Sequence, residues 1–121
     1  METYKSLTDV LTDRKLASLG DAYVNFIHSL ALSNKTGKPS GSKVKGHVLA
    51  EALKKAGLRK HLPSRMTQHT LADAAESLVV YGWLTNALTL DEAATLLEKA
   101  DDAVEGFSQL LIKTKNRVSL P

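Results

Sequence analysis

The sequence predicts an all-α protein, and three observations support that fold class. Apolar residues recur every three to four positions along most of the chain, which is the spacing of one helix face. No stretch of several residues alternates apolar and polar side chains, as a half-buried strand would. The segment 34–41 contains two glycines and one proline and is predicted to be a loop. At 121 residues, the chain is long enough to form one domain over 1–121.

Two helices are predicted before this loop. A short helix over 7–11 follows Ser6, whose hydroxyl can cap its first turn. A longer helix over 14–32 is predicted to end at Ser33-Asn34. It carries one apolar stripe, which we expect to face the core and which consists of Leu16, Leu19, Tyr23, Phe26, Ile27 and Leu30.

Two more helices are predicted in the middle of the chain. Ser42 is a candidate cap for an amphipathic helix that ends at Gly57, a suitable left-handed residue. The next helix starts at Thr67 or Thr70 and is almost continuously apolar after Glu76. We therefore expect this helix to lie at the centre of the fold.

The last predicted helix begins at a capping box. Thr89 and Glu92 have the required types and spacing, and the apolar periodicity that follows extends through Leu111. The tail over 113–121 is expected to fray.

The composition excludes several classes of site. The chain has no cysteine, so it has no disulfide, thiolate metal site or cysteine nucleophile, and redox chemistry is not expected. The first five residues open no long apolar run, and no window approaches the roughly 20 apolar residues of a membrane span. We expect an unprocessed, soluble protein of the cytoplasm with no membrane partner.

Positive charge is concentrated in the middle of the sequence. The segment 35–65 holds nine basic residues and one acidic residue, whereas the segments on either side are net negative. Its basic residues are Lys35, Lys38, Lys43, Lys45, Lys54, Lys55, Arg59, Lys60 and Arg65. Two interpretations are open: a solvated lysine-rich face, or a surface that binds nucleic-acid phosphates by counterion release.

Three carboxylates stand apart from the other acidic residues because their neighbours in sequence are apolar. Asp21 lies in the most apolar part of its helix, where an isolated carboxylate would be costly to bury. Asp73 and Glu76 are three residues apart, so they share one helix face. One interpretation is that each pairs with a lysine or arginine of the basic segment. The other is a site for hard cations such as Mg²⁺ or Mn²⁺, which prefer clustered oxygen ligands.

Other polar and aromatic residues are assigned structural roles. Tyr81 and Trp83 are too few for a base-stacking platform and are predicted to pack in the core. No glycine pattern matches a nucleotide-binding loop, so no nucleotide cofactor is predicted. The histidines show no ligand spacing and no acidic neighbour, and are expected at the surface or its boundary: His28, His47, His61 and His69.

The acidic segments carry a family resemblance. Residues 16–22, Leu-Ala-Ser-Leu-Gly-Asp-Ala, resemble the signature of the ribonuclease III family, Leu-Glu-Phe-Leu-Gly-Asp followed by a small residue. Residues 71–78 are similar to its second acidic motif, Asp-x-x-Glu-Ala-Leu within an apolar helix. Between them, 41–45 and 49–58 resemble the family's Ser-Arg-x-Arg stretch and the helix that follows. The expected fold is a ribonuclease III endonuclease domain-like helical bundle, in the compact form of mini-ribonuclease III.

The resemblance implies a metal-dependent endoribonuclease that acts as a homodimer, each site hydrolysing one strand of double-stranded or structured RNA. Asp21, Asp73 and Glu76 would be the catalytic residues and the ligands of Mg²⁺ or Mn²⁺. With no double-stranded RNA-binding domain in the sequence, the dimer and the basic segment would bind the RNA. The candidate RNA-binding residues are Lys38, Lys43, Lys45 and Arg65.

Two positions leave alternatives open. Ala17 stands where the family signature has a metal-holding glutamate, so one usual carboxylate is missing, as it is in the corresponding Leu-Ala-Tyr-x-Gly-Asp stretch of mini-ribonuclease III. Asn25, one turn after Asp21, is either an orienting residue of the site or an exposed polar side chain. The alternative functions are therefore an inactive ribonuclease III-like scaffold that binds RNA or a ribonucleoprotein, and a helical protein-interaction module.

Overall fold

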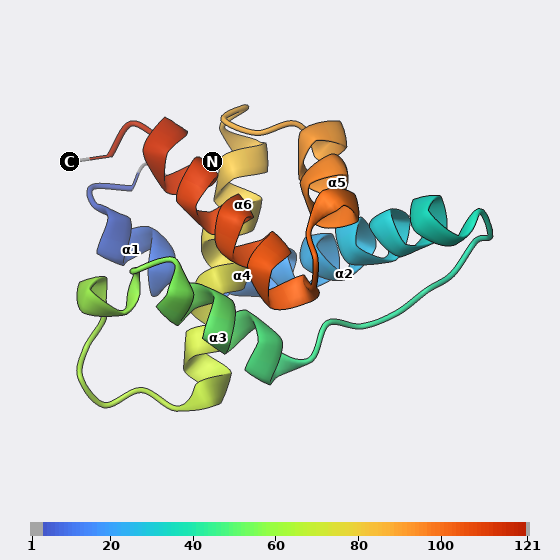
Figure 1. Ribbon diagram of the computed structural model, residues 1–121. Helices are drawn as coiled ribbons and strands as arrows, with labels where there is room; N and C mark the ends of the chain where they lie inside the picture. The colour runs from blue at the N-terminus through green and yellow to red at the C-terminus, as the bar shows by residue number, and fades with distance from the viewer. Residues whose placement is uncertain (1–3, 121) are drawn as a thin grey trace.

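The computed structural model describes residues 4–120 and contains only helical elements within that range (Figure 1). They are α1 (Leu7–Leu11), α2 (Arg14–Thr36), α3 (Gly46–Lys55), a 3-10 helix η1 (Arg59–His61), α4 (Gln68–Leu84), α5 (Leu90–Lys99) and α6 (Ala103–Arg117). The prediction of an all-α fold is confirmed. The first three residues, on which the expectation of an unprocessed N-terminus partly depends, and Pro121 lie outside the described residues.

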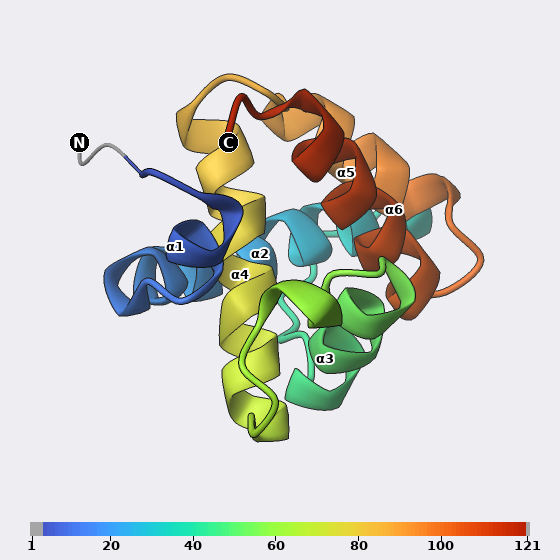
Figure 2. The same cartoon turned by 90° about the vertical axis from the view of Figure 1, so that its left-hand side faces the viewer.

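Helix α4 is the central element, as the sequence predicts. It packs against α1, α2, α3 and α6 and runs through the middle of the molecule (Figure 2). Thr67 caps it, because its side chain accepts a hydrogen bond from the amide of Thr70. Between Leu71 and Val80 every residue except Asp73 is buried. None of the described helices is both long and apolar enough to cross a membrane.

Helix α2 is longer than predicted. Asp13 caps its N-terminus by accepting hydrogen bonds from the amides of Lys15 and Leu16. The helix passes the predicted end at Ser33 and stops after Thr36, where Gly37 has a φ of 73°. Glycine adopts this left-handed conformation without steric cost, which explains the position of the helix end.

The predicted apolar stripe of α2 divides between two faces. Leu16 and Ile27 are buried, but Leu19 is 46% exposed and Phe26 is 54% exposed. The prediction that both residues face the core is therefore wrong. The core face is instead centred on Leu16, Gly20, Val24, Ile27 and Ala31.

The aromatic residues of α4 were also predicted to lie in the core, and Trp83 does not. It is 42% exposed and stacks on Tyr23 of α2 with ring centroids 5.4 Å apart. Tyr81 is partly buried, packed against the core, and meets the Tyr4 ring edge-on.

Helix α3 ends as predicted but begins later. Gly57 follows it with a φ of 77°, which confirms its role at the helix end. Ser42 does not cap the helix, which starts at Gly46 after Lys45 without a side-chain cap. The backbone of Ser42 is instead held by hydrogen bonds to the Ser29 hydroxyl of α2.

The predicted last helix is two helices. The capping box of Thr89 and Glu92 is confirmed at the start of α5. The chain then becomes extended at Ala100, and Asp102 caps α6 by accepting from the amide of Glu105. This second cap explains the break, because it supplies a new helix start where the periodicity suggests continuity.

The predicted fraying of the tail is wrong for its first part. Helix α6 continues to Arg117, with Thr114 fully buried near Gly82. Arg117 donates to the Glu92 carboxylate at 2.8 Å and to the backbone oxygen of Ala87. These contacts hold the last turn against the start of α5.

Candidate active site

A pocket of about 500 Å³ lies between α2 and α4, and it brings together the three predicted carboxylates. It is lined by Arg14, Ala17, Ser18, Asp21, His69, Thr70, Asp73 and Glu76. The two helices approach closely here because residue 20 is glycine. A Cβ at that position would stand 2.2 Å from the backbone oxygen of Glu76. The Leu-Gly-Asp sequence thus places Asp21 directly beside the acidic face of α4.

The three carboxylates differ in exposure. Asp21 is exposed, although its neighbours in sequence are apolar. The side chain of Asp73 is 38% exposed, and Glu76 is only 7% exposed. The pocket therefore has one nearly buried acid at its base and two more accessible ones.

Burial changes the ionisation of Glu76. Loss of solvent raises its pKa to about 8, and the hydrogen bond with Asp21 and the negative charges of Asp21 and Asp73 act in the same direction. At neutral pH the carboxyl group of Glu76 therefore holds a proton, which it donates to the Asp21 carboxylate. The negative charge that these three carboxyl groups bring together therefore calls for a cation nearby.

No lysine or arginine of the described chain forms an ion pair with these carboxylates. Within residues 4–120, no basic side chain of either type pairs with Asp21, Asp73 or Glu76, so the salt-bridge interpretation of these acids is wrong. Asp73 lies instead 3.6 Å from the Nε2 atom of His69, one turn earlier on α4. This contact is not visible in the immediate sequence neighbours of His69. All four histidines lie at the surface or its boundary, as predicted.

Asn25 is half-buried and hydrogen-bonded to Asp21, which favours the orienting interpretation over the exposed one. Its Nδ2 atom donates to the Asp21 carboxylate at 3.1 Å and to the Asp21 backbone oxygen at 2.8 Å. Its Oδ1 atom accepts from the amide of Val44 at 2.7 Å. The side chain therefore connects a predicted metal ligand to the basic segment.

Further residues of the pocket were not predicted. Arg14, Ser18 and Thr70 line it beside the carboxylates, and the i, i+4 spacing of Arg14 and Ser18 on α2 is the sequence pattern that relates them. Arg14 is exposed and has no acidic partner in the described chain. It adds a cation to the rim of the acidic pocket.

The predicted RNA-binding residues are available for contact. They are exposed and form no ion pair within the described range: Lys38, Lys43, Lys45 and Arg65. Other members of the basic segment are engaged, because Lys54 pairs with Glu51, Lys55 with Glu105, and Arg59 with three backbone oxygens.

Comparison with known proteins agrees with this arrangement. The family model described as ribonuclease III matches residues 14–117. The chain belongs to the ribonuclease III family. This confirms the compact ribonuclease III-like fold and supports an RNA-related endonuclease function at the family level. A comparison with curated proteins found no match.

Ribonuclease III proteins generally use divalent metals, and the donor set of this pocket fits such ions in chemistry. All three carboxylates offer oxygen ligands, and protonated Glu76 is a buried acid that a cation would ionise. The three carboxylates do not surround a single ion position in this conformation. In residues 4–120, no group of three acidic or histidine side chains is arranged to hold an ion. Asp73 lies against His69, and Ala17, at the position of the family glutamate, offers no ligand.

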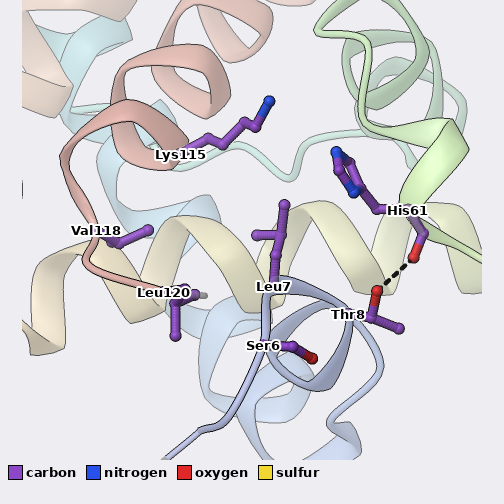
Figure 3. Close-up of a pocket in the computed structure, with 7 residues that line it drawn as sticks. All are labelled: Ser6, Leu7, Thr8, His61, Lys115, Val118 and Leu120. Atoms are coloured by element: carbon purple, nitrogen blue, oxygen red, sulfur yellow. Dashed lines mark hydrogen bonds between the residues drawn. The ribbon is translucent and has the colours of Figure 1, made fainter.

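A second pocket of the ribonuclease III-like fold has a different character (Figure 3). It measures about 240 Å³ and is lined by Ser6, Leu7, Thr8, His61, Lys115, Val118 and Leu120. Thr8 donates to the His61 backbone oxygen at 2.8 Å, and burial lowers the pKa of His61. Because its lining holds no acidic side chain, this pocket offers no metal site of the family type.

The raised pKa of Glu76 predicts how stability depends on pH. In the unfolded chain this group titrates near 4.5, and in the folded protein near 8, so its stabilising contribution is complete below the first value. The contribution is lost as pH rises through the second value. Glu76→Gln keeps a donor for Asp21 but cannot ionise. Without divalent ions, we expect the variant to be more stable than the wild type at pH 8.5 by at least about 1 kcal/mol.

Urea denaturation in EDTA between pH 5 and pH 8.5 measures this difference. The gap between Glu76→Gln and the wild type should widen with pH. Parallel stability curves for the two proteins would show that Glu76 titrates normally in the fold.

Proposed function

We propose that this chain is a divalent-metal-dependent endoribonuclease that cleaves double-stranded or structured RNA by phosphodiester hydrolysis. The observation that carries the proposal is the pocket that Asp21, Asp73 and Glu76 line together, with no lysine or arginine paired to them in residues 4–120. Holding three carboxylates together costs stability unless a cation joins them. Membership of the ribonuclease III family supplies the substrate class.

The roles of the residues follow from their exposure and hydrogen bonds. Asp21 and Glu76 already lie in hydrogen-bonding contact and would hold Mg²⁺ or Mn²⁺ together, with Asp73 beside them. The chemistry that a bound ion supplies is activation of water and neutralisation of charge on the phosphate. Lys43 and Lys45, joined to Asp21 through Val44 and Asn25, would bind the RNA backbone next to the cleaved bond.

Cleavage of a labelled RNA duplex tests the function. The purified protein is incubated with duplex RNA and Mg²⁺ or Mn²⁺, beside a sample in EDTA, and the product ends are analysed. We expect cleavage only with the metal, leaving 3′-hydroxyl and 5′-phosphate ends. Binding without cleavage in either metal, over a wide concentration range, would contradict the catalytic proposal.

That outcome would favour the second candidate function, an inactive RNA-binding or ribonucleoprotein scaffold. Two observations support it: Ala17 supplies no carboxylate, and Asp73 lies against His69 rather than in a closed ligand set. The buried, protonated Glu76 favours the enzyme, because a scaffold gains nothing from a carboxyl group that destabilises its core.

The homodimer is part of the same proposal. Leu19, Tyr23 and Phe26 lie on one face of α2 by their i, i+4, i+7 spacing, and Trp83 of α4 stacks on Tyr23. Leu19, Phe26 and Trp83 are the large apolar residues of this area that are more than 40% exposed. An exposed apolar face of this kind is typical of a protein interface. We propose that a second copy of the chain covers it.

Phe26→Asp tests the dimer. A charge on this face is expected to convert the protein to a monomer, which analytical ultracentrifugation measures. Ile112→Asp is the matched control, because Ile112 is 41% exposed on α6, outside this face, and its replacement should leave the oligomeric state unchanged. A wild-type protein that is monomeric at high micromolar concentration would refute the dimer.

A further inference from the structure

The connection between α2 and α3 is held along α2 by side-chain hydrogen bonds. It runs from the C-terminal end of α2 back to the start of α3 without regular secondary structure (Figure 1). The hydroxyl of Ser33 accepts from the amide of Ser40 at 2.9 Å. The hydroxyl of Ser29 accepts from the amide of Ser42 at 2.9 Å and donates to the Ser42 oxygen at 3.0 Å. We call residues 40–45 the strap.

A third bond continues this series. Asn25 accepts from the amide of Val44 at 2.7 Å. The bonded strap residues are therefore 40, 42 and 44, and their partners on α2 are 33, 29 and 25. Four residues of helix rise about 6 Å, and two residues of extended chain span about 6.6 Å. The two spacings match, so an extended strap stays in register along the helix.

The series ends at the acidic pocket. Asp21 is the next residue at the same spacing, and Asn25 donates to its carboxylate while accepting from Val44. Within the described residues, Asn25 is thus the one α2 residue that bonds both to the strap and to a predicted metal ligand. It couples the position of the strap to that of the Asp21 carboxylate.

The strap leaves its other edge open. In an extended chain, alternate residues direct their amides to opposite sides, and the amides of Gly41 and Lys43 have no acceptor within residues 4–120. Apart from Gly41 itself and its two neighbours in the chain, no described residue has an atom within 4 Å of the place where a Cβ of Gly41 would stand. Lys43 and Lys45 are exposed, whereas Val44 between them packs against the core.

We propose that the strap is a preordered binding surface for RNA phosphates, and that Asn25 is a positioning residue that fixes this surface relative to Asp21. Free backbone amides and unpaired lysines are the groups that contact nucleic-acid phosphates. A segment ordered before binding avoids the entropy cost of ordering it in the complex. The proposal rests on the RNA-cleaving function for its substrate class, but its tests require no cleavage.

Hydrogen exchange of the free protein tests the order of the strap. We expect the amides of Ser40, Ser42 and Val44 to exchange slowly and those of Gly41 and Lys43 to exchange rapidly. Asn25→Ala should remove the protection of Val44. Uniformly fast exchange from residue 40 to residue 45 in the wild type would overturn the preordered strap.

Two titrations then separate the strap from the metal ligand. Ser29→Ala breaks a strap contact that does not involve Asp21. Asn116→Ala on α6 is the matched control, since the side chain of Asn116 forms no hydrogen bond in the described chain. We expect Ser29→Ala and Asn25→Ala each to weaken metal-free binding of duplex RNA by about 3- to 10-fold. Only Asn25→Ala should also raise the Mn²⁺ concentration needed for half-saturation of the protein.

The outcomes distinguish this inference from the proposed function. Unchanged RNA affinity in both variants would refute the phosphate-binding strap, even if the wild type cleaves RNA. An equal loss of Mn²⁺ affinity in Ser29→Ala and Asn25→Ala would refute the positioning role of Asn25. If the strap behaves as expected and the wild type does not cleave, the strap inference stands and the enzyme proposal fails.

Discussion

Glu76→Gln is expected to lower the single-turnover rate of duplex RNA cleavage by about 1,000-fold or more. The substitution preserves the size of the side chain and a donor for Asp21, but it removes the negative charge that would hold the ion at the base of the pocket. Glu76 is the least exposed of the three carboxylates, at 7%, so water cannot readily take the place of its carboxylate beside the ion. Quenched-flow cleavage at saturating enzyme and Mg²⁺ measures the rate.

Two companion measurements make this result specific. Binding of the same duplex without divalent ions should be unchanged in Glu76→Gln, because the strap and its lysines are intact. Glu98→Gln, on α5, should cleave at the wild-type rate, since Glu98 contacts Asn34 and lies outside the pocket. A Glu76→Gln protein that cleaves within about 10-fold of the wild-type rate would remove Glu76 from the catalytic set.

Gly20→Ala is expected to cause the largest loss of stability among single substitutions at the site. Its new methyl group would meet the Glu76 backbone oxygen at 2.2 Å and the carbonyl carbon at 2.5 Å. Backbone atoms of a central helix cannot move aside as a flexible side chain does, so α2 and α4 must separate. We expect a loss of about 3 kcal/mol and a fall in Tm of roughly 10 °C.

Gly46→Ala is the control for this prediction. Gly46 is also helical, but the nearest atom to its added Cβ would be the Ala72 methyl group at 3.9 Å, an ordinary contact. Its stability should stay within about 0.5 kcal/mol of the wild type. Thermal denaturation of both variants tests the pair. Equal stability of Gly20→Ala and the wild type would show that the helices are not in close contact at the pocket.

The acidic pocket was predictable from the sequence in part. The i, i+3 spacing of Asp73 and Glu76 fixes their common face on any helix, and the Leu-Gly-Asp sequence places glycine where two helices must approach. The exposure of Asp21 was not predictable, because apolar neighbours in sequence do not surround a side chain that points to another face of the helix.

The exposed apolar face of α2 was misassigned for a physical reason. Helical periodicity shows which residues share a face, but a helix with two apolar faces gives no sign of which one meets the core of its own chain. Leu19 and Phe26 were therefore placed with Leu16 and Ile27. An interface for a second chain has the same apolar character as a core.

The face of α2 that holds the strap has a pattern in the sequence. Asn25, Ser29 and Ser33 follow Asp21 at intervals of four in a largely apolar part of the helix, a pattern that predicts one polar face. Their partners are backbone amides of a loop, and loop backbone positions carry no periodicity in sequence. The break before α6 also has a local signal in the sequence, because Asp102 followed by Glu105 is a recognisable helix start, but the apolar periodicity continues across it.

Titration of Mn²⁺ into the metal-free protein tests the central claim, that Asp21, Asp73 and Glu76 form one metal site. We predict saturable binding with a Kd below about 1 mM, weakened at least about 10-fold by Asp21→Asn, Asp73→Asn or Glu76→Gln and unchanged by Glu98→Gln. The opposite result, no saturable binding or the same affinity in all four variants, would show that these carboxylates do not bind a metal together.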